Sequence, residues 1–149
     1  MAGAMLAAAP VTIVTAGTHV LEGQPMGRRT RDALEATGTP VPLHRSHQLT
    51  DGDVAVADLV IAMATEHVAY IRRAHPDAAA RTGTIRRLCR DLPDTPEPLA
   101  TRVATLGLAD VELETWEDVD DPAGGEDEVY VACAADLLRL TTELLSRLR

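Results

Sequence analysis

An Asp in a turn that contains proline and glycine is the residue of this chain best suited to acid–base chemistry. Residues 121–125 read D-P-A-G-G, where the proline would stiffen the loop and the glycines would let it turn close to a substrate. A carboxylate held in this way can protonate a leaving group and then take a proton from water. An ordinary acidic turn would have the same composition. We expect Asp118 and Asp120 to be solvated neighbours of Asp121.

One segment has the C-x5-R spacing of a thiolate nucleophile with a phosphate-binding arginine. It covers residues 133–139, C-A-A-D-L-L-R. The segment lies in the apolar stripe of a predicted helix, where backbone N–H groups are used in i to i−4 hydrogen bonds and cannot bind an anion. It has no glycine, and Asp136 would repel phosphate. We therefore expect Cys133 to be a core residue, and likewise Cys89, which has Thr95 instead of arginine six positions later.

No pattern in the sequence indicates a metal or a cofactor. The acidic run at residues 117–121 lacks the D-x-D-x-D-G spacing of a calcium loop. The histidines have no metal-ligand spacing with a carboxylate or cysteine, and we expect all of them in surface or loop positions: His19, His44, His47, His67 and His75. We expect neither a metal nor a cofactor.

The composition is that of a soluble globular protein, and its length predicts one domain over residues 1–149. The net charge of −9 is concentrated after residue 90, and no basic stripe with interleaved aromatic residues is present, so nucleic-acid binding is not expected. No apolar run reaches the roughly 18 residues that span a bilayer, so we expect no membrane partner. Two cysteines fit a reducing cytoplasm, which is the predicted location.

Short apolar runs alternate with amphipathic segments along the chain. This alternation predicts an α/β sandwich with a mostly parallel sheet. The apolar run at residues 59–63 indicates a strand that we expect to be buried on both faces, and Thr65 is expected to cap the helix that follows it. The predicted strands cover residues 11–15, 59–63 and 82–85. The predicted helices cover residues 26–37, 65–74, 99–108 and 127–148. A further short helix is predicted to start at the T-x-x-D pattern of residues 50–53.

Several motifs in family order show that the chain resembles the low-molecular-weight protein tyrosine phosphatases. Those enzymes have an S-A-G-T, a G-x-P, an S-x-Q-L-T-like segment, an A-D-L-V-I-x-M strand and a D-P-x-G-G loop with an aromatic residue soon after. The corresponding segments here are residues 15–18 (T-A-G-T), 23–25 (G-Q-P), 46–50 (S-H-Q-L-T), 57–63 (A-D-L-V-I-A-M) and 121–125, followed by Tyr130. Each motif alone is weak, but their common order and spacing make a strong signal.

The first residues of the chain extend this resemblance. Residues 1–6 read M-A-G-A-M-L, similar to the M-A-E-A-M-L helix that follows the family's C-x5-R-S-P phosphate loop. We therefore expect the sequence to be an N-terminally shortened reading of a longer protein; the alternative is an alanine-rich start that is similar by chance. The resemblance implies a three-layer α/β/α sandwich with strand order 2-1-3-4, whose central first strand is missing here. Such a chain should have low stability, because strand edges lose their partners.

The resemblance also implies a function. Members hydrolyse phosphotyrosine through a cysteinyl-phosphate, and the substrate would be a phosphotyrosine protein or a small phosphomonoester. Asp121 matches the family's general acid and base, whereas the nucleophilic Cys and the phosphate-binding Arg have no match, so the chain should be inactive as it stands. Two alternatives are a non-catalytic binding module and an arsenate reductase of the same fold, for which Cys89 is thin support as a resolving cysteine.

Overall fold

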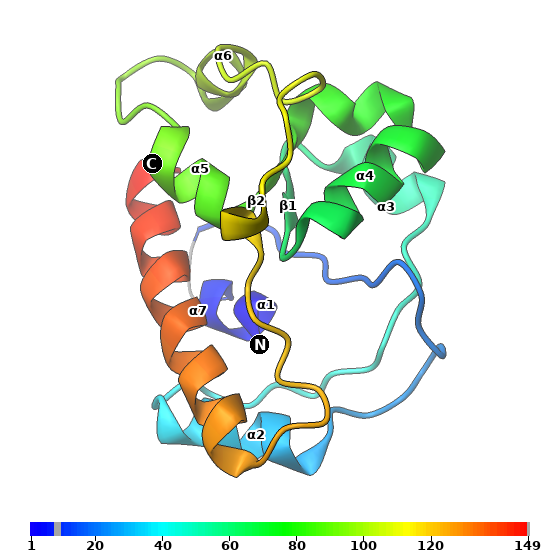
Figure 1. Ribbon diagram of the computed structural model, residues 1–149, viewed down its shortest axis with the longest axis vertical. Coiled ribbons are helices and arrows are strands. Elements are labelled where there is room, and N and C mark those ends of the chain that lie inside the picture. The colour runs from blue at the N-terminus through cyan, green and yellow to red at the C-terminus, as the bar shows by residue number, and fades with distance from the viewer. Residues whose placement is uncertain (8–9, 149) are drawn as a thin grey trace. The chain divides into compact units, whose positions relative to one another are not determined.

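The computed structural model describes residues 1–7 and 10–148 (Figure 1). It divides into two compact units, and each is described by itself. Unit 1 comprises Met1–Leu49 and Asp120–Leu145, and unit 2 comprises Thr50–Val119 with the residues from Ser146 onward. Within the described part of the chain, no helix has the length and apolar character needed to cross a bilayer.

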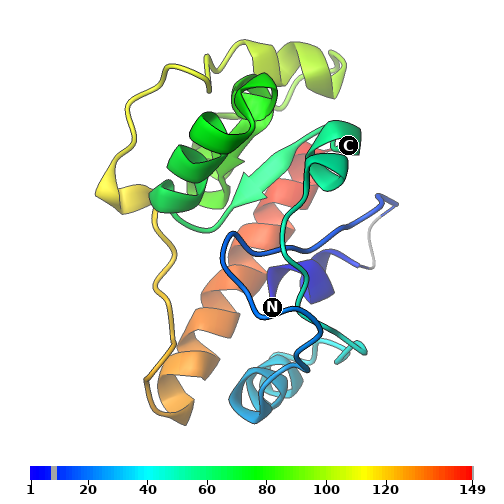
Figure 2. The same ribbon diagram turned by 90° about the vertical axis from the view of Figure 1, so that its right-hand side faces the viewer.

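A parallel pair of strands lies at the centre of unit 2. Strand β1 (Val60–Ala62) pairs with β2 (Thr82–Thr84) in the register Val60 with Thr82 and Ala62 with Thr84. Parallel neighbours need a crossover connection, which is provided here by α4 (Thr65–Ala74) and the 3-10 helix η1 (Pro76–Arg81). Both views show the two strands side by side (Figures 1 and 2). The remaining elements of unit 2 are α3 (Asp51–Val56), α5 (Ile85–Asp91), α6 (Leu99–Ala104) and the 3-10 helix η2 (Thr115–Glu117).

Two α-helices of unit 2, α3 and α5, begin with a side-chain cap. Thr50 and Asp53 form a capping box, in which Thr50 Oγ1 accepts from the Asp53 N–H at 3.2 Å and Asp53 accepts from the Thr50 N–H at 2.9 Å. Thr84 caps α5 in the same way by accepting from the Arg87 N–H. The prediction that Thr65 caps α4 is wrong, because Thr65 is the first residue of that helix and Ala64 occupies the cap position.

A buried ion pair joins η2 to α5. Glu117 is 0% exposed and Arg87 is 5% exposed. Arg87 donates from Nε to Glu117 Oε2 at 2.9 Å and from Nη2 to Oε1 at 2.5 Å. Glu117 also accepts from the Thr84 hydroxyl at 2.8 Å and from the Glu114 N–H at 2.9 Å. These bonds satisfy a carboxylate whose burial would otherwise be very costly.

The described residues of unit 1 form three helices joined by segments without regular secondary structure. The helices are α1 (Ala2–Leu6), α2 (Arg28–Ala36) and all but the end of α7 (Asp127–Arg147). Gly38 ends the turn after α2 with a φ of +71°, a left-handed conformation that glycine adopts without strain. The predicted stripe of α7 is largely confirmed, since Cys133, Leu137, Leu140 and Leu144 are buried and follow one another at steps of 4, 3 and 4 residues. Ala134 and Thr141 are buried beside them.

The prediction of a strand at residues 11–15 is wrong. These residues are not in a sheet in the structure, and Val11 and Val14 are 41% and 58% exposed. Their β-branched side chains favour extended backbone, but a strand also needs a neighbour to pair with, and the described residues provide none to this segment. Within the same residues, β1 pairs with β2 alone.

Two other predictions on unit 2 need correction. The strand predicted at residues 59–63 is not buried on both faces, because Val60 and Ile61 are partly exposed and only Ala62 of β1 is buried. The helix expected at residues 99–108 ends at Ala104, and Gly107 then turns the chain with a φ of +58°. The predicted α/β fold with a parallel sheet is confirmed.

Candidate functional site

The loop that carries Asp121 is a tight turn in unit 1. Asp121 is exposed, and its Oδ1 accepts from the Ala123 N–H at 3.0 Å. The Gly125 N–H donates to the Pro122 carbonyl at 2.9 Å and closes a four-residue turn. Gly124 has a φ of +81° inside it, the position where a type II turn requires glycine. The D-P-x-G-G pattern thus gives a solvent-facing carboxylate on a closed turn.

Arg29 of α2 contacts the residues that join this turn to α7. Its Nη1 donates to the Gly125 carbonyl at 2.7 Å, and its Nε donates to Asp127 Oδ1 at 2.8 Å. Its Nη2 lies 3.4 Å from Glu126 Oε2. The sequence analysis did not find this residue, because its partners lie 96 to 98 positions further along the chain.

The neighbours of Asp121 differ from each other. Asp120 is exposed, as expected. The prediction that Asp118 is merely solvated is wrong, because it is half-buried in unit 2 and its Oδ1 accepts from the Thr65 N–H at 2.6 Å. Its carboxylate therefore provides the N-terminal cap that α4 lacks from its own residues.

The C-x5-R segment lies inside α7, as expected. Cys133 is 8% exposed, and burial, together with the charges of Asp136, Asp121 and Asp120, raises the pKa of its thiol. A nucleophilic cysteine needs the opposite shift. Arg139 points to solvent and pairs with Asp136 at 2.9 Å and Glu143 at 3.5 Å. Cys133 and Arg139 therefore do not form a phosphate loop.

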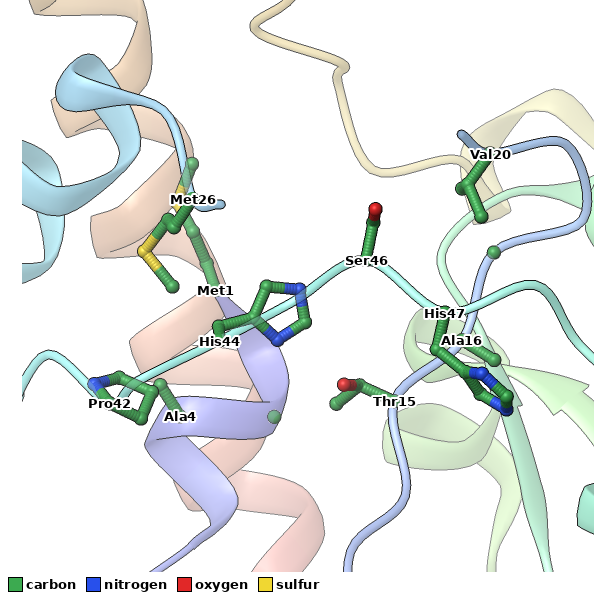
Figure 3. Close-up of a pocket in the computed structure, with 12 residues that line it drawn as sticks. Met1, Ala4, Thr15, Ala16, Val20, Met26, Pro42, His44, Ser46 and His47 are labelled. Atoms are coloured by element: carbon green, nitrogen blue, oxygen red, sulfur yellow. The ribbon is translucent and has the colours of Figure 1, made fainter. Parts of the chain in front are cut away.

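A pocket of about 240 Å³ lies in unit 1 among the segments that resemble family motifs. Residues of the T-A-G-T and S-x-Q-L-T segments line it together with the start of α1 (Figure 3). Figure 3 shows that His44, Ser46 and His47 follow one another along the same extended segment. The lining residues are Met1, Gly3, Ala4, Thr15, Ala16, Gly17, Val20, Met26, Pro42, His44, Ser46 and His47.

Gln48 holds the turn that follows the T-A-G-T segment. Its Nε2 donates to the Thr18 carbonyl at 2.8 Å, and its Oε1 accepts from the Val20 N–H at 3.1 Å. The backbone of Gly17 bonds on either side of it, to His47 and Leu49. The S-x-Q-L-T segment therefore positions one wall of the pocket.

Ser46 likewise holds the loop at residues 21–24 through hydrogen bonds to its backbone. Its hydroxyl donates to the Leu21 carbonyl and accepts from the Gln24 N–H. Its backbone N–H donates to the Gln24 carbonyl at 2.8 Å. Ser46 and Gln48 are conspicuous in the sequence only through their motif.

Asp121 is not among the residues that line the pocket.

The described residues contain no group of three His, Cys, Asp or Glu side chains that could hold a metal ion. His75 lies in a loop position between α4 and η1, as predicted, but its side chain is not at the surface. Its side chain is 11% exposed, and its Nδ1 lies 3.0 Å from Asp51 Oδ1. His75 follows α4 directly, so it packs within unit 2.

Comparison with known families identifies the class of protein. The family model described as low molecular weight phosphotyrosine protein phosphatase matches residues 3–101. The chain therefore belongs to this family, as its motifs predicted. The match covers the T-A-G-T and S-x-Q-L-T segments and ends before the loop of Asp121. Among curated proteins, none matches the chain significantly.

Solved structures agree with this family. The chain is 26% identical to the YwlE arginine phosphatase from Geobacillus stearothermophilus, with a TM-score of 0.75 over 99% of this chain and 82% of that one. It is 28% identical to a low molecular weight protein tyrosine phosphatase from T. tengcongensis, with a TM-score of 0.65 over 87% of this chain and 72% of that one. Vibrio vulnificus Wzb, solved with benzylphosphonate, is 18% identical with a TM-score of 0.70 over 96% and 84% of the two chains, a likeness that concerns the fold alone.

Proposed function

We propose that this chain is a phosphatase domain of its family in which Asp121 is the general acid and base. The observation that carries the proposal is the exposed Asp121 carboxylate on the closed D-P-x-G-G turn. A general acid must reach the leaving oxygen within hydrogen-bond distance, so it needs both exposure and a fixed backbone. The turn provides both.

The proposed reaction takes two steps. In the first, a cysteine thiolate attacks phosphorus, the ester P–O bond breaks, and the protonated Asp121 gives its proton to the leaving oxygen. In the second, the Asp121 carboxylate takes a proton from water, whose oxygen attacks phosphorus and releases inorganic phosphate and the thiolate. An arginine that binds the phosphoryl oxygens bidentately would stabilise both transition states.

We further propose that the 149 residues alone do not supply the thiolate or that arginine. Cys133 is buried in α7 with a raised pKa, and Cys89 is buried in α5. Arg139 pairs with two carboxylates of α7 instead of facing a loop. On this proposal the chain does not turn over phosphomonoesters by itself, and activity requires a C-x5-R loop that supplies the thiolate and the arginine.

The proposed substrate is a phosphorylated protein side chain or a small phosphomonoester. The two more similar structures are an arginine phosphatase and a tyrosine phosphatase, so phosphoarginine and phosphotyrosine are both to be tested. The two cysteines are not joined in a disulfide, which supports the cytoplasm as the proposed location.

The proposal is tested by joining an apolar strand and a C-x5-R-S-P loop ahead of Met1. The longer chain should hydrolyse p-nitrophenyl phosphate, and Asp121→Asn should lower its kcat by about 10²- to 10⁴-fold, the usual contribution of general acid catalysis. Asp120→Asn, at an exposed position in the same loop, is the matched control and should leave kcat almost unchanged. If both substitutions have equal effects, Asp121 is not the general acid.

A further inference from the structure

The geometry points to Arg29 as the positioning residue that holds the D-P-x-G-G turn, and with it the Asp121 carboxylate, in place; this inference rests on the proposed role of Asp121. Arg29 has all three of its guanidinium nitrogens on one short stretch of chain. Nη1 binds the Gly125 carbonyl at 2.7 Å, Nε binds Asp127 at 2.8 Å and Nη2 approaches Glu126 at 3.4 Å. Because the guanidinium is planar and binds several partners at once, it fixes both the orientation of these partners and their distance from α2.

The shortest of these contacts is linked to Asp121 through two further hydrogen bonds. Gly125, whose carbonyl is held by Arg29, donates its own N–H to the Pro122 carbonyl at 2.9 Å. Inside the turn so closed, the Ala123 N–H donates to Asp121 Oδ1 at 3.0 Å. One end of the turn is thus fixed to α2, and the other end carries the candidate acid.

Gly125 itself has little room to move. A Cβ added there would lie 3.0 Å from the Val129 Cβ and 3.1 Å from the Pro122 oxygen. The turn therefore packs closely against the first turn of α7 while Arg29 holds its carbonyl.

The neighbouring Arg28 offers a matched control. It lies on the same helix turn and carries the same charge, and its Nη2 lies 3.5 Å from Asp127 Oδ1. Its Nη1 pairs with Asp32 in its own helix instead of binding a loop carbonyl. Arg28 is also more exposed, at 61% of its side chain against 38% for Arg29. Loss of Arg28 removes a charge from this region but no bond to the turn.

We expect Arg29 to affect the position of the D-P-x-G-G turn more than the stability of the fold. Its ionic partners Glu126 and Asp127 are well exposed, at 83% and 57%, and exposed ion pairs add little to the stability of a fold. A misplacement of about 1 Å can nevertheless lower a catalytic rate about 10²-fold. The expected result of losing Arg29 is therefore a disordered turn in a chain that still folds.

Amide hydrogen exchange of the 149-residue chain tests this inference. Ala123 and Gly125, whose N–H groups are bonded within the turn, should exchange about tenfold faster in Arg29→Ala, as local opening predicts. Arg28→Ala should leave both amides unchanged. Arg29→Lys keeps the positive charge but lacks the planar guanidinium with its several donors. It should therefore restore only part of the protection of these two amides from exchange. In all three variants the exchange rates of the α7 amides and the urea midpoint should equal those of the parent chain. If Arg29 only stabilised the fold, its loss would change these two quantities as well.

Unchanged exchange at Ala123 and Gly125 in Arg29→Ala would overturn the inference, as would equal effects of Arg28→Ala and Arg29→Ala. In the longer chain with a phosphate loop, Arg29→Ala should lower kcat about 10- to 100-fold with little change in KM, and combination with Asp121→Asn should cause no further loss. The hydrogen-exchange result tests the role of Arg29 even if the longer chain proves inactive. Failure of this inference can therefore be distinguished from failure of the proposed function.

Discussion

The Glu117 carboxylate, which is completely buried, accepts hydrogen bonds from both Nε and Nη2 of Arg87. This bidentate pair connects the 3-10 helix η2 to α5 within unit 2, and Trp116 beside it lies with its ring 5.4 Å from the Arg87 guanidinium carbon and 3.9 Å from that of Arg90. The segment that follows leads through Asp118 toward the loop of Asp121.

Removal of the carboxylate should destabilise the protein strongly. Glu117→Ala leaves the Arg87 charge buried without its partner, which costs about 3–5 kcal/mol of unfolding free energy. Glu117→Gln should cost less, since the amide oxygen can still accept from the Thr84 hydroxyl or the Glu114 N–H. Urea unfolding measures both. Glu112→Ala is the control, because Arg87 binds only the backbone carbonyl of Glu112, and its effect should stay below about 0.5 kcal/mol.

The same pair should make stability depend on pH in the acid range. Burial by itself would raise the pKa of Glu117, but the hydrogen bonds from Arg87, the Glu114 N–H and Thr84 outweigh it and hold that pKa below its ordinary value of 4.5. A lowered folded-state pKa means that the unfolded chain binds the proton first as the pH falls.

The contribution of Glu117 is therefore complete above the unfolded-state pKa and is lost as the pH falls through the folded-state pKa. The unfolding free energy should decrease below about pH 4.5, with a limiting slope for this one proton of about 1.4 kcal/mol per pH unit. Glu117→Gln should have a shallower acid slope in the same urea titrations. Equal slopes in the parent and the variant would show that Glu117 titrates normally.

The thiol of Cys133 should be unreactive in the folded chain. It is 8% exposed, and burial and nearby carboxylates raise its pKa, so little thiolate is present at neutral pH. With Cys89→Ala leaving Cys133 as the single thiol, reaction with a disulfide reagent at pH 7 should be at least about tenfold slower in buffer than in denaturing urea. Rapid labelling in buffer would instead indicate an activated nucleophile and would contradict our account of this cysteine.

Asp118 should contribute to stability as the cap of α4. Asp118→Ala removes the acceptor that lies 2.6 Å from the Thr65 N–H and should cost about 0.5–2 kcal/mol. Asp118→Asn keeps an acceptor and should recover most of that loss. Asp120→Ala, at an exposed position two residues later, should change the urea midpoint little, and a similar loss in this variant would argue for a general effect of charge.

Elements with a strong local signal were predicted well. Residues 127–148 have a long apolar stripe, and α7 covers Asp127–Arg147. The T-x-x-D pattern predicted the capping box at Thr50 and Asp53. Local patterns work here because caps and helix stripes depend on residues three or four positions apart.

Elements that depend on distant partners were not predicted. Arg29 contacts residues 96 to 98 positions away and Asp118 contacts one 53 positions away, and no local pattern reports such pairs. Helix α5 was missed because Ile85–Asp91 is short and directly follows β2. Residues 11–15 have the side chains of a strand, but propensity alone does not supply a neighbour to pair with.

Turnover of p-nitrophenyl phosphate by the purified 149-residue chain tests the central claim most directly. The account predicts no turnover above that of a heat-denatured sample, because neither cysteine can form an accessible thiolate, and it predicts that a strand and a C-x5-R-S-P loop joined ahead of Met1 will produce turnover that depends on Asp121. Turnover by the 149-residue chain that survives in the double variant Cys89→Ala and Cys133→Ala would contradict it.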